Sequence, residues 1–179
     1  MNKSINLTLS GICLLIAGVL IIASKSIGVS LTKILVPLSF IACGVFSYLF
    51  SQANKQHKIA YSYHLMQSIG LVLFGLLIAF SPNSLQSFLM YICFFLMLYG
   101  LLEILFGFSA LNTRFKINWS MLITRFITGF LSMIGSVYLL LTMMDDEIKG
   151  VKIAGVLTIL GGLSFVWFAQ KVKNLQQES

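Results

Sequence analysis

Residues 69–84, IGLVLFGLLIAFSPNS, and residues 96–107, LMLYGLLEILFG, decide the fold. Both belong to apolar stretches near the ~20 residues that a helix needs to cross the hydrocarbon core of a bilayer. Ser81-Pro82-Asn83-Ser84 lies between them, and this sequence favours a tight turn that ends the first helix. The two stretches therefore predict a hairpin of transmembrane helices.

Similar apolar segments continue on both sides of this hairpin. Six can be drawn, at about residues 7–24, 29–51, 63–81, 85–109, 119–143 and 150–170. The connections are too short to hold a soluble catalytic or sensor domain. We predict an all-α, polytopic membrane protein whose six transmembrane helices form a single membrane domain over residues 1–179.

The hairpin also has counterparts earlier and later in the chain. GICLLIAGVLIIAS (11–24) with IACGVFSYLF (41–50) precedes it, and TGFLSMIGSVYLLL (128–141) with LTILGGLSFVWF (157–168) follows it. Glycines stand at comparable points of the six helices, at Gly18, Gly44, Gly75, Gly100, Gly135 and Gly161. We predict three repeated hairpins, at about 7–56, 63–113 and 119–172, whose glycines let helices pack closely in lipid.

Composition supports a membrane protein and excludes several other classes. Hydrophobic residues make up 58% of the 179 residues and charged residues only 9%, against about 25% charged in a soluble domain. The net charge of +7 does not indicate a nucleic-acid partner, because the basic residues stand at the ends of apolar runs. There they contact lipid headgroups and set topology.

The distribution of basic residues predicts the orientation. One side of the predicted bundle would carry eight of them and the other four. The positive-inside rule therefore places both termini in the cytoplasm. The larger group is Lys3, Lys55, Lys58, Arg114, Lys116, Arg125, Lys171 and Lys173, and the smaller is Lys25, Lys33, Lys149 and Lys152.

No motif of a known chemistry is present. The sequence has no GxxxxGK, HExxH or GxSxG. Cys13, Cys43 and Cys93 lie singly inside apolar runs, which indicates neither disulfides nor a metal site. We expect a protein that is not an enzyme and that has no cofactor and no metal.

Glu103 and Arg125 are charged residues inside apolar runs. Residue 103 precedes, and residue 125 follows, position 114 by eleven residues, near the turn between two antiparallel helices. They should lie at similar depth, and a carboxyl group in lipid either finds a cationic partner or stays protonated. We predict a buried ion pair, which would be either an interhelical clamp or part of a proton or ion pathway.

Two further groups of polar residues are candidate sites. Ser47 and Ser164 stand three residues after Gly44 and Gly161, as Glu103 does after Gly100, and His64 stands almost where Arg125 does in its own unit. These side chains could share one polar layer. On the opposite side, Asp145, Asp146 and Glu147 form either a solvated turn or a pH-responsive patch whose carboxylates raise one another's pKa.

The six-helix length, the glycine-containing segment IGLVLFGLLIAFSPNS with its following proline, and LMLYGLLEIL resemble the HdeD-like family of bacterial membrane proteins. Only the second unit keeps the proline, since Lys25 and Thr142 stand at the corresponding places of the other two. The resemblance implies an inner-membrane protein with cytoplasmic termini, linked in some members to acid resistance. It implies no catalytic residues.

Three functions remain open at this point. The first is a non-enzymatic inner-membrane protein of the HdeD-like type that contributes to acid or envelope stress tolerance. The second is a small channel or proton-linked transporter that uses Glu103 as its ionisable site. The third is a scaffold that binds lipids, other membrane proteins or further copies of itself.

Overall fold

The computed structural model describes residues 3–82, 84–112, 119–142 and 146–177. Their backbone is almost entirely helical. The elements in this part of the chain are α1 (Lys3–Ile22), α2 (Ser24–Ile27), α3 (Val29–Ala53), α4 (Lys58–Phe80), α5 (Leu85–Asn112), α6 (Trp119–Thr142) and α7 (Glu147–Gln177).

Six of these helices, all except the short α2, are long and apolar enough to span a membrane. Their spans run from 19 to 28 residues, so each can cross ~30 Å of hydrocarbon at 1.5 Å per residue. The exposed surface carries apolar side chains such as Leu38 and Ile69, each 59% exposed. The prediction of an all-α, six-helix membrane protein is confirmed.

Helix ends follow backbone chemistry more closely than they follow the apolar runs. Gly28 joins α2 to α3 at φ 88°, a conformation that glycine adopts without strain. The helix expected to begin near residue 63 begins at Lys58, because the Tyr61 amide already donates to the His57 carbonyl at 2.9 Å. α4 ends at Phe80, since Ser81 is extended ahead of Pro82.

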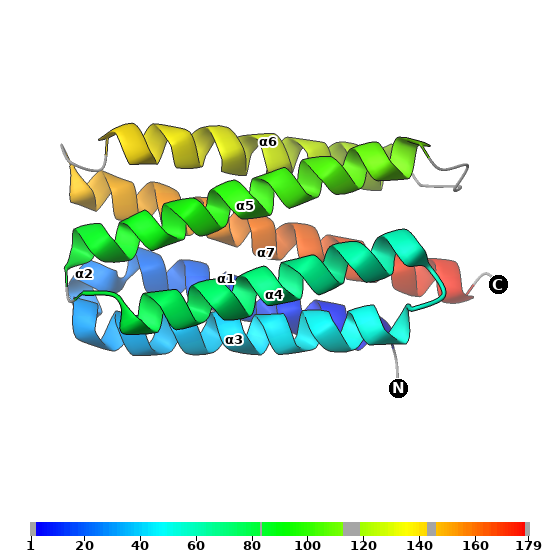
Figure 1. Ribbon diagram of the computed structural model, residues 1–179, viewed down its shortest axis with the longest axis horizontal. Helices are drawn as coiled ribbons and strands as arrows, with labels where there is room; N and C mark the ends of the chain where they lie inside the picture. Colours follow the sequence, from blue (N-terminus) through cyan, green and yellow to red (C-terminus); the bar gives the residue numbers. More distant parts are fainter. Residues whose placement is uncertain (1–2, 83, 113–118, 143–145, 178–179) are drawn as a thin grey trace.

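The six long helices lie roughly side by side, with both chain termini and the α3–α4 turn at one end of the bundle (Figure 1). The most extensive packing is between α1 and α7, followed by α3 with α4 and α5 with α6. Each pair joins the last helix of one predicted hairpin to the first helix of another. The contact of α7 with α1 closes the bundle.

One backbone contact recurs in all three of these pairs. A Cβ added at Gly44, Gly100 or Gly162 would lie 3.0, 2.6 or 2.9 Å from a carbonyl oxygen of the neighbouring helix. Such distances leave no room for a side chain, and small residues provide this approach where helices associate in lipid. The carbonyls belong to Ser68, Gly129 and Gly11, respectively.

Two of the six glycines singled out in the sequence have another environment. Gly18 and Gly75 face backbone carbonyls closely, as Gly44 and Gly100 do. Gly135 meets the side chain of Leu157, and Gly161 meets those of Leu14 and Tyr99. At the α1–α7 contact the close approach is made by Gly162, one residue after Gly161. The three-hairpin repeat stays a prediction, although this contact recurs.

Candidate functional site: a buried polar cluster

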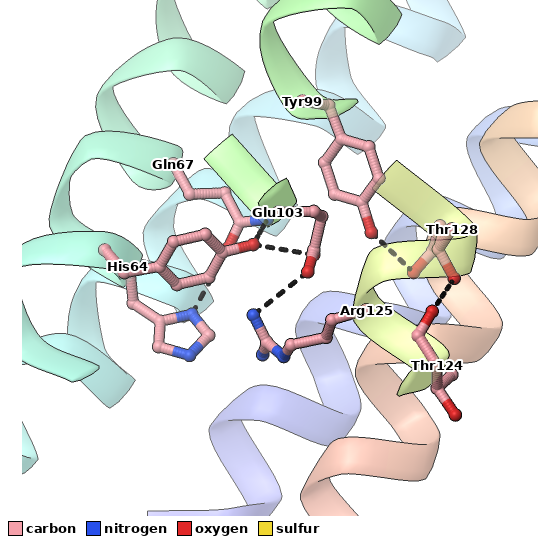
Figure 2. A network of polar contacts seen from close by, with 9 residues as sticks. His64, Gln67, Tyr99, Glu103, Thr124, Arg125 and Thr128 are labelled. Carbon is pink, nitrogen blue, oxygen red and sulfur yellow. Dashed lines mark hydrogen bonds and ion pairs between the residues drawn. The ribbon is translucent and has the colours of Figure 1, made fainter. Parts of the chain in front are cut away.

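Glu103 of α5 and Arg125 of α6 meet inside the bundle. Arg125 Nη1 lies 3.1 Å from Glu103 Oε2, and the two side chains are 2% and 0% exposed (Figure 2). Their separation along the chain places them at the same depth of the α5–α6 pair. The structure thus brings together the two residues predicted to form an ion pair.

The glycine contact between α5 and α6 makes this geometry possible. Gly129 stands one helical turn after Arg125, and a Cβ there would lie 3.0 Å from both the Glu103 Cβ and the Gly100 carbonyl oxygen. Because neither Gly100 nor Gly129 has a side chain, the two backbones approach each other next to the ion pair.

Helix α4 supplies further partners for the carboxylate. The Tyr63 hydroxyl donates to Glu103 Oε1 at 2.6 Å, and Gln67 Nε2 donates to the Tyr63 hydroxyl oxygen at 3.1 Å. His64 Nδ1 lies 3.2 Å from Gln67 Oε1. A continuous chain of polar contacts therefore runs from His64 through Gln67, Tyr63 and Glu103 to Arg125.

Aromatic rings enclose the guanidinium of Arg125. Its Cζ lies 4.1 Å from the ring centroid of Phe168, 4.2 Å from that of Phe106 and 4.8 Å from that of Tyr63. A desolvated cation–π contact stabilises by roughly 2 kcal/mol. The charge is therefore held by a carboxylate on one side and by ring faces from α4, α5 and α7.

The predicted polar layer is only partly realised. His64 is fully buried, and the Ser47 hydroxyl donates to the backbone carbonyl of His64 at 3.5 Å. Ser164 is also buried on α7, but the α7 side chains next to the His64 ring are two phenylalanines. Phe168 and Phe165 lie 5.8 and 6.4 Å from the imidazole centroid.

Sequence reasoning missed Tyr63, Gln67, Phe106 and Phe168. Tyr63 is 6% exposed and lies inside the cluster. The signal that could have found Tyr63 and Gln67 is their spacing of four residues, which places them on one helix face. Nothing in the sequence marks Phe106 and Phe168 among the 15 phenylalanines.

The acidic group allowed two interpretations, a solvated turn and a pH-responsive patch, and its described residues form a turn at the start of α7. Asp145 lies outside the described residues, and Asp146 caps α7, because its Oδ1 accepts from the Ile148 and Lys149 amides at 3.1 and 3.0 Å. The backbone and side-chain hydrogen bonds from Lys149 hold the pKa of Asp146 below its ordinary value. The expected mutual rise in pKa is therefore not seen at Asp146, and Glu147 is simply the first residue of the helix.

The described residues contain no group of three His, Cys, Asp or Glu side chains that could hold a metal ion. Cys43 Sγ contacts the Ser10 hydroxyl at 3.1 Å, which ties α3 to α1. An apolar groove between α4 and α5 has no ionisable carboxylate in its lining, which is formed by Phe74, Leu77, Tyr91, Phe94, Met97, Leu98 and Leu101.

The cluster can hold charge, restrain helices or relay a proton. No protein family model, curated protein or solved structure shows a significant match to the chain.

Proposed function

We propose that this protein is a non-enzymatic, multi-pass protein of a bacterial inner membrane, with cytoplasmic termini, that contributes to tolerance of acid or envelope stress. Its buried polar cluster acts as a clamp that holds α4, α5, α6 and α7 together. The observation that carries the proposal is the complete enclosure of the Glu103–Arg125 pair.

Electrostatics support a clamp. A lone charge in the bilayer interior is costly, but a buried pair with hydrogen bonds and cation–π contacts is neutral overall and recovers most of that cost. Removal of one partner leaves the other charge buried, at a cost of about 3–5 kcal/mol. The pair therefore fixes which helices must meet, since other arrangements of the bundle leave a charge in lipid.

The scarcity of acidic residues supports a role under acid conditions. Acid unfolds proteins mostly by protonating carboxylates that are paired or hydrogen-bonded in the native state. This chain has only five Asp and Glu residues among 179, and Glu103 is shielded from solvent. Few groups can therefore lose native interactions when the outside becomes acidic.

Survival of acid challenge tests the proposal. A strain that lacks the protein should survive less well, and the wild-type gene should restore survival. Glu103→Gln should fail to restore it, because Arg125 then remains buried without a counter-charge. Glu147→Gln, which changes an exposed acid at the start of α7, is the matched control and should complement fully. Equal survival of the parent strain and the strain that lacks the protein would refute the proposal.

A proton-linked transporter is the second candidate, and one observation favours it. The polar contacts from His64 through Gln67 and Tyr63 to Glu103 form an unbroken hydrogen-bonded chain inside the bundle. Such chains carry protons in membrane pumps and transporters. Purified protein in liposomes should then acidify the lumen under an imposed proton gradient, as reported by an enclosed pH-sensitive dye. Glu103→Gln should abolish this proton flux. Flux equal to that of empty liposomes would reject this candidate.

A further inference from the structure

Three buried nitrogen atoms of the polar cluster have no hydrogen-bond partner among the described residues. They are His64 Nε2, Arg125 Nε and Arg125 Nη2. In the view of Figure 2 the imidazole of His64 and the guanidinium of Arg125 are drawn next to each other, with no dashed line between them. The ring of Phe168 borders both groups, since its centroid lies 5.8 Å from the imidazole centroid and 4.1 Å from Arg125 Cζ.

The hydrogen-bond chain fixes which of these atoms donate. The carboxylate of Glu103 is paired with Arg125 and can only accept, so the Tyr63 hydroxyl gives its proton to Glu103 Oε1. The Tyr63 oxygen must then accept from Gln67, which turns the amide nitrogen of Gln67 toward Tyr63 and its carbonyl oxygen toward His64. This carbonyl can only accept, so His64 carries its proton on Nδ1.

His64 Nε2 therefore presents a lone pair, while Arg125 Nε and Nη2 present N–H groups. A molecule that lies between them must accept from the guanidinium and donate to the imidazole. We propose that this place is a binding site for one buried water molecule, which bridges His64 Nε2 and Arg125. Buried polar groups in proteins rarely lack a partner, and internal waters typically make about three hydrogen bonds.

The same chemistry disfavours an anion. The Glu103–Arg125 pair is already neutral, so a halide would add one uncompensated negative charge to the bundle interior. Its electron pairs would also face the lone pair of His64 Nε2. A water molecule avoids both costs because it is neutral and can donate as well as accept.

The water closes the cluster into a ring of hydrogen bonds. The ring runs from His64 through Gln67, Tyr63, Glu103 and Arg125 to the water and back to His64. From Arg125 through the water, His64, Gln67 and Tyr63 to Glu103, each intermediate group accepts one hydrogen bond and donates the next, so these bonds polarise one another and His64 becomes a member of the clamp.

The tautomer of His64 gives the first test. Full-length protein labelled with ¹⁵N-histidine has two imidazoles, His57 and His64, and His57→Gln assigns them. In two-bond ¹H–¹⁵N spectra in nanodiscs at neutral pH, His64 should show a protonated Nδ1 and an unprotonated Nε2 that accepts a hydrogen bond. A protonated Nε2 in the spectrum of the wild-type protein overturns the proposal.

An experimental structure that shows ordered solvent gives the second test. A solvent peak should lie about 2.7–3.2 Å from both His64 Nε2 and an Arg125 nitrogen. The peak should be lost in His64→Phe and kept in His57→Gln. Direct contact of His64 Nε2 with Arg125 without a peak, or an anomalous signal at this place in crystals grown with bromide, overturns the proposal.

Discussion

The α5–α6 and α1–α7 pairs share one backbone contact but differ in what surrounds it. Gly100 approaches Gly129 in the first pair, as Gly162 approaches Gly11 in the second. In the α5–α6 pair, Glu103 stands three residues after Gly100, and Arg125 stands four residues before Gly129. In the α1–α7 pair, Phe165 stands three residues after Gly162, and Leu7 stands four residues before Gly11. Equivalent places therefore hold an ion pair in one interface and two fully buried apolar side chains in the other.

The third pair, α3 with α4, is intermediate. Its corresponding residues are Ser47 and His64, which are buried and polar but carry no ion pair with each other. Close packing of helices in lipid thus depends on small residues at the contact and not on charge. The Glu103–Arg125 pair is an addition to a contact that the same bundle also builds without it.

The largest expected effect is the loss of one charge from the α5–α6 pair. Glu103→Gln or Arg125→Leu should lower the free energy of unfolding by about 3–5 kcal/mol, because the remaining charge stays buried without its partner. Unfolding by SDS in mixed micelles, followed by circular dichroism, measures this loss. The Leu7→Ala variant in the α1–α7 pair is the comparison, since it removes packing without unmasking a charge.

Exchange of the two charges sharpens this prediction. Glu103→Arg with Arg125→Glu should recover part of the expression lost in either single variant, because the pair is restored. Full recovery is not expected, since the guanidinium then leaves the ring faces of Phe106 and Phe168. A swapped protein no better expressed than the single variants would count against an ion pair.

The next effect concerns the hydroxyl that α4 donates to the carboxylate. Tyr63→Phe keeps the ring beside Arg125 but removes the 2.6 Å hydrogen bond to Glu103. The expected loss is about 1.5–3 kcal/mol, the usual range for a hydrogen bond to a charged group. The same unfolding assay measures it, with Tyr61→Phe as control. Equal stability of the Tyr63→Phe variant and the wild type would mean that the Tyr63 hydroxyl of α4 does not contribute to the clamp.

Added methyl groups should damage both helix pairs alike. Gly100→Ala and Gly162→Ala place a Cβ 2.6 and 2.9 Å from backbone oxygens, so the helices must move apart. We expect losses of about 1–3 kcal/mol for each. Gly150→Ala is the control, because among the described residues its Cβ would meet only the end of the Leu89 side chain, at 3.3 Å. Losses confined to Gly100→Ala would mean that the two contacts are not equivalent.

The smallest effect lies outside both interfaces, at the α7 cap. The lowered pKa of Asp146 means that its carboxylate stabilises the fold above its ordinary pKa of 3.8 and loses this effect as the pH falls through the lower folded-state value. Asp146→Asn should therefore lower the melting temperature slightly at pH 7 and not at pH 2. A difference that grows on acidification would contradict this sign.

The fold and the ion pair could be predicted from the sequence because both follow from the free-energy cost of placing polar and charged groups in lipid. Apolar stretches of this length have one low-energy arrangement in a bilayer, and a charge inside one of them needs a partner at the same depth. Glu103 and Arg125 lie at equal distances from one turn, so depth alone was enough to pair them.

The rest of the site depends on helix rotation, which hydropathy does not encode. One residue corresponds to about 100° around a helix. The sequence comparison took Gly161 as the repeat position, so it placed Ser164 in the polar layer. The close contact is made by Gly162, and the residue three positions later is Phe165, whose ring lies beside His64. Tyr63 likewise stands near the start of an apolar run, where hydropathy does not show which way its side chain points. Its position inward of the interface follows from how α4 packs against α5, which only the structure shows.

The double variant Glu103→Phe with Arg125→Leu tests the central claim most directly, because it builds the Phe165–Leu7 arrangement into the α5–α6 pair. If the charges clamp a contact that does not itself need charge, the double variant should be more stable than either Glu103→Phe or Arg125→Leu alone, with a coupling energy of about 3 kcal/mol in the double-mutant cycle. A double variant whose loss equals the sum of the two single losses would contradict the account.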